Sequence, residues 1–342
     1  MTINIELLEL FRCPKTGQRL RLENGGASIP KIEEGWLVSE DGSERYPVLK
    51  GIPRFVPQSN YADNFGMQWN HFRKTQLDSH SGHPISTERF WMATGWSPEA
   101  IKGQWVLDAG CGAGRFAEVA LMAGAKVVAL DYSSAVDACY ANLKNHPNLH
   151  VVQGDIYALP FAPEVFHFVY SLGVLQHTPD VATAVAALPR VLRVGGRLCA
   201  DFYWKRFRTM LHAKYLFRPL TKRMGQPKLF RLLQRCVPTL LAVSQALGRV
   251  PLVGQGLKRI VPVSDYTGRI PLSDQQLKEW ALLDTFDMLA PTYDNPQSAA
   301  TIRHWFEQAG LQEIQLGHWG HLVGRGIKTG LIAERRIGKV LL

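Results

Sequence analysis

Cysteine is scarce in this 342-residue chain. The five cysteines are scattered and none stands at the C-x-x-C spacing; they are Cys13, Cys111, Cys139, Cys199 and Cys236. An odd and unpaired set argues against a disulfide framework and against a cysteine metal site, and it favours a reducing compartment. The sequence therefore predicts a cytoplasmic protein that holds no metal.

Long apolar runs are also missing. No uninterrupted stretch approaches the roughly 20 residues that a membrane-spanning helix needs. The first ten residues contain Glu6 and Glu9 and no basic segment, unlike a signal peptide. With 46% hydrophobic and 10% aromatic residues, the chain can still bury a sizeable core, and its length exceeds that of one ordinary domain. We expect a core domain with attached segments.

Acidic residues are absent from one long segment. Residues 202–264 contain no Asp or Glu, but they contain thirteen Lys and Arg. The rest of the chain holds 26 basic and 29 acidic residues, so the formal net charge of +10 belongs to this segment. Such charge asymmetry indicates an anionic partner or surface.

The most informative motif that is present is Val-Leu-Asp-Ala-Gly-Cys-Gly-Ala-Gly-Arg-Phe at residues 106–116. An apolar strand leads into three alternating glycines, and a helical pattern follows over residues 115–123. Glycine permits positive φ and close approach of a ligand, and a helix start offers unpaired N–H groups. The motif predicts a ligand lying against the first strand-to-helix turn of a doubly wound sheet.

The glycine spacing and two later acids indicate which ligand this is. G-x-G-x-G differs from the dinucleotide fingerprint, and the missing Lys-Ser/Thr pair excludes a P-loop. A second strand, residues 126–130, ends in Asp131, which can accept both ribose hydroxyls. A third, residues 149–153, ends in Gly154-Asp155, where a carboxylate can take an exocyclic amine. Ribose and adenine without a pyrophosphate point to S-adenosyl-L-methionine.

Five landmarks in order closely resemble class I S-adenosyl-L-methionine-dependent methyltransferases of the type 11 family. They are Asp108 to Gly114, Asp131-Tyr132, Gly154-Asp155-Ile156, the strand 165–172 and the strand 192–202 around Gly195-Gly196. The resemblance covers about residues 101–204 and implies an α/β fold with a Rossmann-like seven-stranded sheet. It also implies a final helix at 298–309 and two closing antiparallel strands at 311–317 and 321–328.

The resemblance also implies roles for individual residues. The glycine loop would hold the methionine part, with Asp108 near its amino group, and Asp131 would hold the ribose diol. Tyr132 and Ile156 would enclose the adenine, with Asp155 at its amine. The residues expected to bind the cofactor are Asp108, Gly110, Gly112, Gly114, Asp131, Tyr132, Gly154, Asp155, Ile156, Ser171, Trp69 and Gln76. A simple capping or turn role for Asp108 stays open.

The segments around the core carry separate expectations. The two ends of residues 1–57 resemble the zinc-ribbon domain of methyltransferase activator subunits, but Thr16 stands where a second cysteine would fall, so we expect a metal-free packing platform. Residues 58–100 would form a helical lid, with Gln68, Trp69, Thr75 and Gln76 as candidate pocket residues. The remaining divisions are a core at 101–204, a basic helical insert at 205–264 and a C-terminal part at 265–342 that completes the sheet.

Within the insert, one stretch has the apolar spacing of an amphipathic helix. The apolar stripe consists of Leu229, Leu232, Leu233, Cys236 and Val237, with Lys228, Arg231 and Arg235 beside it. Pro238 is expected to end this helix. Upstream, Phe207, Met210 and Leu211 show a similar but less regular amphipathic spacing. Three uses stay open: a cap that forms the acceptor pocket, peripheral contact with an anionic membrane, and contact with nucleic acid, which is less favoured.

Candidate catalytic residues follow the fourth strand and the insert. Methyl transfer mainly requires alignment, and an oxygen or carbon acceptor also needs a base. His177 is the best base candidate because an imidazole titrates near neutrality, although it could instead cap the next helix. Asp287 and Tyr293 are the substrate-side candidates, in a segment where Asp294 and Asn295 could be helix caps.

Three function classes follow from these residues. We favour a methyltransferase acting on an oxygen or carbon of a small-molecule or lipid-linked acceptor. An RNA or protein methyltransferase is the alternative, although residues 171–174 lack the Asn/Asp-Pro-Pro-aromatic signature of base N-methylation. A non-catalytic binding module is disfavoured because the cofactor residues are intact. The sequence does not indicate an oligomeric state.

Overall fold

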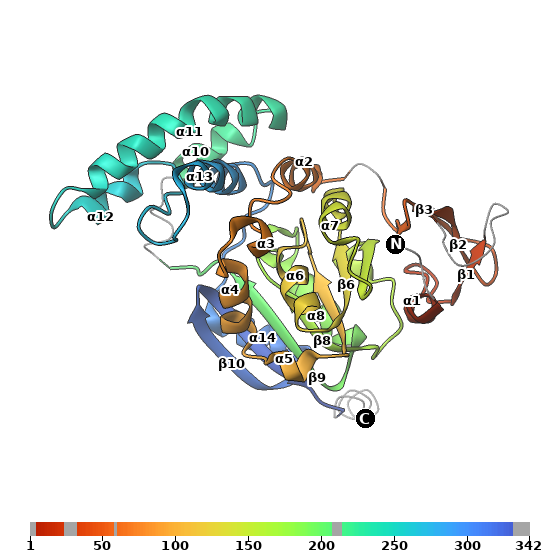
Figure 1. The fold of residues 1–342 in the computed structure, drawn as a ribbon. Helices are drawn as coiled ribbons and strands as arrows, with labels where there is room; N and C mark the ends of the chain where they lie inside the picture. Colours follow the sequence, from red (N-terminus) through yellow and green to blue (C-terminus); the bar gives the residue numbers. More distant parts are fainter. Residues whose placement is uncertain (1–4, 24–32, 58–59, 207–213, 331–342) are drawn as a thin grey trace.

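The computed structural model describes residues 5–23, 33–57, 60–206 and 214–330. Within these ranges the chain forms a central sheet covered by helices, a small antiparallel unit and a helical layer that projects beyond the sheet (Figure 1). The predicted apolar residues Phe207, Met210 and Leu211 lie outside the described residues. Among the described helices, none is long and apolar enough to cross a bilayer.

Seven strands form the central sheet in the order β10-β11-β9-β8-β5-β6-β7. Strands β9, β8, β5, β6 and β7 run parallel, and β10 and β11 are antiparallel at one edge. The strand bounds are β5 Trp105–Ala109, β6 Lys126–Asp131, β7 Leu149–Gln153, β8 Phe166–Ser171, β9 Leu192–Phe202, β10 Leu311–Trp319 and β11 His321–Lys328. This topology confirms the predicted Rossmann-like α/β sheet and its closing hairpin.

Two apolar cores lie on opposite faces of this sheet, because neighbouring residues of a strand point to opposite sides. Leu107 packs with α8 and α14, whereas Val106 packs with α4, α6 and α7. The helix bounds are α4 Ile85–Thr94, α6 Arg115–Met122, α7 Ala135–Leu143, α8 Val181–Val191 and α14 Ala299–Gln308. Because helices bury both faces of the sheet, the parallel strands are continuous apolar runs in the sequence.

The N-terminal unit covers the β7 edge of the sheet. Its elements are α1 Ile5–Leu10, β1 Leu20–Glu23, β2 Glu34–Ser39, β3 Arg45–Leu49 and β4 Ile52–Pro53. Arg54 pairs in parallel with Gln153, whose carbonyl accepts the Phe55 N–H at 2.8 Å. Phe11 and Phe55 join the core of the main sheet. The unit thereby protects an edge that would otherwise be unpaired; its likeness to a zinc ribbon stays a prediction.

Between this unit and the sheet, the lid region forms four short helices. They are α2 Asp63–His71, α3 Asp78–Ser81, α4 and α5 Pro98–Ile101. Helix α2 packs against α7, close enough that Asn70 donates to the Ser134 carbonyl at 2.9 Å. Helix α2 therefore lies near the carboxyl end of β6, where Asp131 is located, whereas α4 and α5 contribute to the core on one face of the sheet.

The helical layer above the sheet, here called the cap (residues 214–290), is built from α10 to α13 (Figure 1). Its bounds are α10 Lys214–Thr221, α11 Gln226–Gly248, α12 Gly254–Leu257, η3 Lys258–Ile260 and α13 Asp274–Leu289. Leu229, Leu233 and Val237 of α11 pack with Phe286 of α13 in a separate apolar core. The cap thus extends past residue 264 and includes the segment that carries Asp287.

Two sequence-based expectations about α11 were wrong. The helix continues through Pro238 for ten more residues to Gly248. Pro238 lies on the exposed side, so water can hydrate the carbonyl that loses its donor, and packing of Leu241 beyond it offsets the cost of about 3 kcal/mol. Leu232 was expected in the buried stripe, but it is 44% exposed.

Candidate active site

A cavity of about 700 Å³ lies at the carboxyl ends of β5, β6, β7 and β8 and continues beneath the cap. Most of the predicted site residues line it: Trp69, Gln76, Gly110, Gly112, Asp131, Tyr132, Gly154, Asp155, Ile156, His177 and Asp287. Asp108, Gly114, Ser171 and Tyr293 are outside its wall. The structure therefore gathers residues from six separate stretches of the sequence at one edge of the sheet.

The glycine loop after β5 forms one wall of the cavity. Gly110 has φ +100°, and a Cβ there would stand 2.4 Å from the Val174 side chain. The Gly112 N–H donates to Asp131 Oδ2 at 2.9 Å, which holds the loop against the end of β6. Gly114, with φ +91°, is the N-cap residue of α6. The loop thus leaves its backbone open to a ligand, because no side chain projects from it at Gly110 or Gly112.

The acids that follow β6 and β7 are partly engaged by the backbone. Asp131 Oδ1 accepts from the Ser133 N–H at 2.9 Å, and burial raises the pKa of Asp131. Asp155 accepts from the Tyr157 N–H at 2.9 Å, and burial likewise raises its pKa. Each carboxylate oxygen can accept more than one hydrogen bond, so both groups can still receive a ligand's hydroxyl or amine.

Two rings and one aliphatic side chain surround the expected adenine position. Tyr132 and Ile156 line the cavity, as the family resemblance implies. Tyr61, which sequence analysis missed, also lines it, with its ring centroid 5.0 Å from that of Tyr132. The two rings are tilted by 30° to each other, and an aromatic face of this kind can pack against a flat heterocycle.

Asp108 lies behind the glycine loop and is only 2% exposed. Its Oδ2 has no hydrogen-bond partner among the described residues, and burial raises the pKa of the carboxyl to about 8. It does not cap α6, because the N-cap residue of that helix is Gly114. A buried carboxylate with one unpartnered oxygen beside this loop suits a cationic amine, which is the charge that the methionine part of the cofactor carries.

His177 is held in one orientation at the acceptor side of the cavity. Its Nδ1 lies 3.0 Å from the Tyr293 carbonyl; a carbonyl can only accept, so Nδ1 carries the proton. Nε2 therefore has a free lone pair, and it has no partner among the described residues. The ring sits between Phe65 and Tyr203, with centroids 5.3 and 5.4 Å away. Asp180, not His177, caps α8.

The other predicted acceptor-side residues have different surroundings. Asp287 accepts from the Tyr203 hydroxyl at 3.4 Å and lines the cavity. Tyr293 contributes its carbonyl to His177, and its ring meets that of Tyr61 edge-on. Asp294 is no helix cap, because it pairs with Lys214 at 2.8 Å. Ser298 caps α14 instead.

A second polar network beneath the cap was missed by sequence analysis. The Tyr266 hydroxyl and Gln76 Nε2 both donate to Asp284, the latter at 3.2 Å. Arg115 donates to Gln76 Oε1 at 3.0 Å and to Ser86 Oγ at 2.8 Å. Burial raises the pKa of Asp284 to about 6. Asp284 precedes Asp287 by one helical turn, and that spacing was the only available signal.

The remaining predicted lid residues point at α13 rather than into the cavity. Gln68 Nε2 lies 3.5 Å from Asp287 Oδ1, and Thr75 donates to Glu279. Ser171 is fully buried and donates to the Ala109 carbonyl at 2.7 Å. These contacts join the lid to the cap and β8 to β5, so Gln68, Thr75 and Ser171 shape the site from outside its wall.

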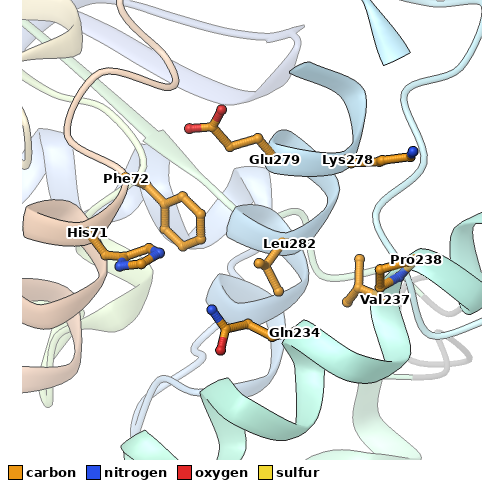
Figure 2. Close-up of a pocket in the computed structure, with 8 residues that line it drawn as sticks. All are labelled: His71, Phe72, Gln234, Val237, Pro238, Lys278, Glu279 and Leu282. Carbon is orange, nitrogen blue, oxygen red and sulfur yellow. The ribbon is translucent and has the colours of Figure 1, made fainter. Parts of the chain in front are cut away.

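A smaller cavity of about 300 Å³ lies at the seam between lid and cap (Figure 2). His71 and Phe72 face it from the end of α2, Gln234 and Val237 from α11, and Leu282 from α13. None of the predicted site residues lines it. The chemistry of the predicted site therefore belongs to the larger cavity.

Comparison with known proteins agrees with this geometry. Residues 107–200 match the protein family described as "Methyltransferase domain". The chain contains a methyltransferase domain. Its cofactor is S-adenosyl-L-methionine. The glycine loop, the acids after β6 and β7 and the unpartnered Oδ2 of Asp108 fit that molecule.

Two relatives of the methyltransferase domain are named for a small-molecule acceptor or for an acceptor bound to a carrier protein. The chain is 36% identical over 118 residues to a demethylmenaquinone methyltransferase of Thermobifida fusca, covering 33% of this chain and 50% of that protein. It is 38% identical over 97 residues to a malonyl-[acyl-carrier protein] O-methyltransferase of Pectobacterium atrosepticum, covering 28% and 38%. The chain thus spans half or less of these relatives' length.

A solved structure is similar at a lower level. It is a SAM-dependent methyltransferase from Aquifex aeolicus, with a TM-score of 0.37 and 12% identity over 69% of this chain and 89% of that one. The strand order of the sheet itself establishes the fold of the methyltransferase domain.

Proposed function

We propose that the protein transfers a methyl group from S-adenosyl-L-methionine to an oxygen or carbon atom of a small-molecule or lipid-linked acceptor. The observation that carries this proposal is the single cavity that runs from the glycine loop to His177 and on beneath the cap. A donor at the loop and an acceptor under the cap would meet beside His177.

On the donor side, the chain's own groups bind and orient. The glycine loop and Asp131 hold the nucleoside and methionine parts, and Asp108 supplies a negative charge for the amine. When bound, S-adenosyl-L-methionine supplies an electrophilic methyl group with its own leaving group. The enzyme's main task is then alignment of the acceptor atom with that methyl group.

On the acceptor side, His177 Nε2 takes the proton that an attacking hydroxyl or activated carbon gives up. Its lone pair is free among the described residues, and the Tyr293 carbonyl fixes the tautomer. Two carboxylates also line the acceptor side: Asp284 accepts from Tyr266 and Gln76, and Asp287 accepts from the Tyr203 hydroxyl at 3.4 Å. We favour His177 as the base because its Nε2 has no hydrogen-bond partner within the described residues.

The acceptor side of the cavity supports a compact, partly apolar acceptor. Ile270, Trp280 and Met288 line it, together with the polar Tyr203 and Asp284. These residues come from the cap and from the end of β9, so an acceptor would lie between the two. Aromatic and aliphatic walls with a few polar groups are typical of small-molecule sites.

The test uses the full chain with methyl-labelled S-adenosyl-L-methionine and two extracts of the cells that make the protein, one lipid and one water-soluble. Transfer of label to a component of either extract, and its loss in His177→Gln with unchanged cofactor affinity, would support the proposal. Labelling of RNA or protein alone would contradict it. The matched control is His304→Gln, at an exposed histidine on α14 that does not line the cavity.

A further inference from the structure

The exposed apolar side chains of this protein are concentrated in the cap. Of the fourteen large apolar side chains that are exposed among the described residues, nine lie between 216 and 260. They are Leu216, Phe217, Leu220, Leu232, Val243, Val250, Leu252, Val253 and Ile260. Single exposed apolar residues are ordinary, but such a concentration marks a surface that meets something.

Helix α11 divides this surface from the interior. Leu229, Leu233, Val237 and Leu241 face α13 and are buried. The opposite side of the helix is basic in its first half, and the exposed side chains there are Lys228, Arg231, Leu232 and Arg235. In its second half that side is apolar, with Ala242, Val243, Ala246 and Val250 exposed. We call this side, together with the turn at 250–253, the outer surface of the cap.

The turn after α11 presents its apolar side chains most fully. Leu252 is completely exposed (105% of its reference area), and Val253 is 55% exposed. Leu252 also has φ +67°, a conformation that non-glycine residues rarely adopt. The fold therefore leaves a leucine exposed to water in the short segment that joins α11 to α12; Figure 1 shows these two helices in the cap.

The basic residues of the cap between 214 and 258 fall into two groups. Lys214, Arg218 and Lys258 are largely buried and pair with Asp294 or Asp265. The others are exposed and form no ion pair within the described part of the chain: Lys222, Arg223, Lys228, Arg231, Arg235 and Arg249. The first group stabilises the fold. The second group leaves a positive surface with no acid between 202 and 264 to neutralise it.

We propose that the outer surface of the cap docks on a bilayer that contains anionic headgroups. Lys228, Arg231 and Arg235 would contact the headgroups, and Leu252 and Val253 would enter the interface. A second copy of the chain would bring like charges together, which opposes self-association through this surface. Nucleic acid would pair with the arginines but would leave the apolar turn in water.

This placement has a consequence that rests on the proposed function. Other parts of the cap, Lys214, Tyr266 and Trp280, line the acceptor side of the cavity. The cap would therefore contact lipid on one side and line the acceptor side of the cavity on the other, so docking would hold the cavity close to the bilayer. Docking itself requires no methyl transfer and can be measured without it.

The experiment is sedimentation of the full chain with vesicles. Vesicles of phosphatidylcholine with phosphatidylglycerol should carry the protein down at low salt, and phosphatidylcholine alone should not. Arg231→Gln/Arg235→Gln should weaken the partition coefficient by roughly fivefold per charge. Leu252→Ser/Val253→Ser should weaken it at high salt as well, because the apolar contribution is not screened.

The matched controls are Arg190→Gln/Arg303→Gln, which removes two exposed arginines on α8 and α14, and Met122→Ser, at an exposed apolar residue at the end of α6. Both controls should bind as the unchanged protein does. The proposal is overturned by no sedimentation at low salt, by equal losses in the control and cap variants, or by a Leu252→Ser/Val253→Ser variant that binds normally. Salt-sensitive binding of a short RNA without vesicle binding would overturn it in favour of nucleic acid. Label transfer to the lipid and water-soluble extracts, measured on the same samples, tests the proposed function separately from docking.

Discussion

Binding of the cofactor should depend on pH through Asp108. Burial raises the pKa of this carboxyl from 3.8 to about 8, so about nine in ten molecules hold the proton at pH 7. A cationic amine beside the glycine loop favours the ionised form. Binding must therefore release the proton, which costs about 1.4 kcal/mol at pH 7, or tenfold in affinity, and about tenfold more at pH 6.

The measurement is calorimetry with S-adenosyl-L-homocysteine, which retains the amine, between about pH 6 and pH 8 in buffers of different ionisation enthalpy. We expect the dissociation constant to rise about tenfold from pH 7 to pH 6, with close to one proton released per molecule bound. Above about pH 8 the ligand's own amine begins to lose its charge, so affinity should stop rising.

The variant Asp108→Asn should remove both the slope and the proton release. The control is Asp284→Asn, which removes another carboxyl of raised pKa, about 6, on the acceptor side of the same cavity. It should leave the slope between pH 6 and pH 7 in place. A pH-independent dissociation constant in the unchanged protein, or a slope that survives in Asp108→Asn, would refute the assignment of Asp108 to the amine.

The raised pKa of Asp108 should also make the stability of the folded protein depend on pH. The folded-state pKa of Asp108 is above its unfolded value of 3.8, so the folded protein binds this proton more tightly. The contribution of Asp108 to the free energy of unfolding is therefore most favourable below about pH 4, and it is lost as the pH rises to about 8. Asp108→Asn should raise the free energy of unfolding near pH 8, and urea denaturation at two pH values would show whether it does.

Three further predictions concern binding, catalysis and packing. Asp131→Ala should weaken S-adenosyl-L-homocysteine binding by about a hundredfold, because two hydrogen bonds to a charged group are lost at about 1.5 kcal/mol or more each; a calorimetric change under threefold would contradict the ribose assignment. His177→Gln should lower kcat by about 10²–10⁴-fold at unchanged cofactor affinity, and unchanged turnover would show that it is not the base. Phe90→Ala removes a fully buried ring that packs with Trp96 and Tyr170, and it should cost about 3–5 kcal/mol in urea denaturation.

The cofactor side was predictable because its signals are local. A glycine loop, an acid at the end of the next strand and another after the third stand at short, regular spacings, and parallel strands bring their carboxyl ends to one edge. The structure places Asp131, Gly154 and Asp155 in one cavity wall accordingly. The roles of these residues remain predictions, and the measurements above test them.

The acceptor side was only partly predictable. His177 and Asp287 were identified by residue type and position, and both line the cavity. Asp284 stands three residues before Asp287, but nothing in the sequence singled it out as a site residue. Its hydrogen-bond donor Gln76 lies more than 200 residues earlier in the chain, and only the fold brings the two together. Tyr293 was chosen for its phenol, but its carbonyl is the group that contacts His177.

By itself, then, the sequence determined the order of strands and helices, the donor-binding edge and the positive charge of the cap, because each depends on composition or on near neighbours. Tertiary structure decided which residues meet beneath the cap and that α11 continues through Pro238. It also decided which of the cap's arginines and lysines are neutralised and which remain exposed. The physical reason is that burial and pairing across long sequence separations depend on how helices pack, and packing overrides local preference when the apolar gain is larger.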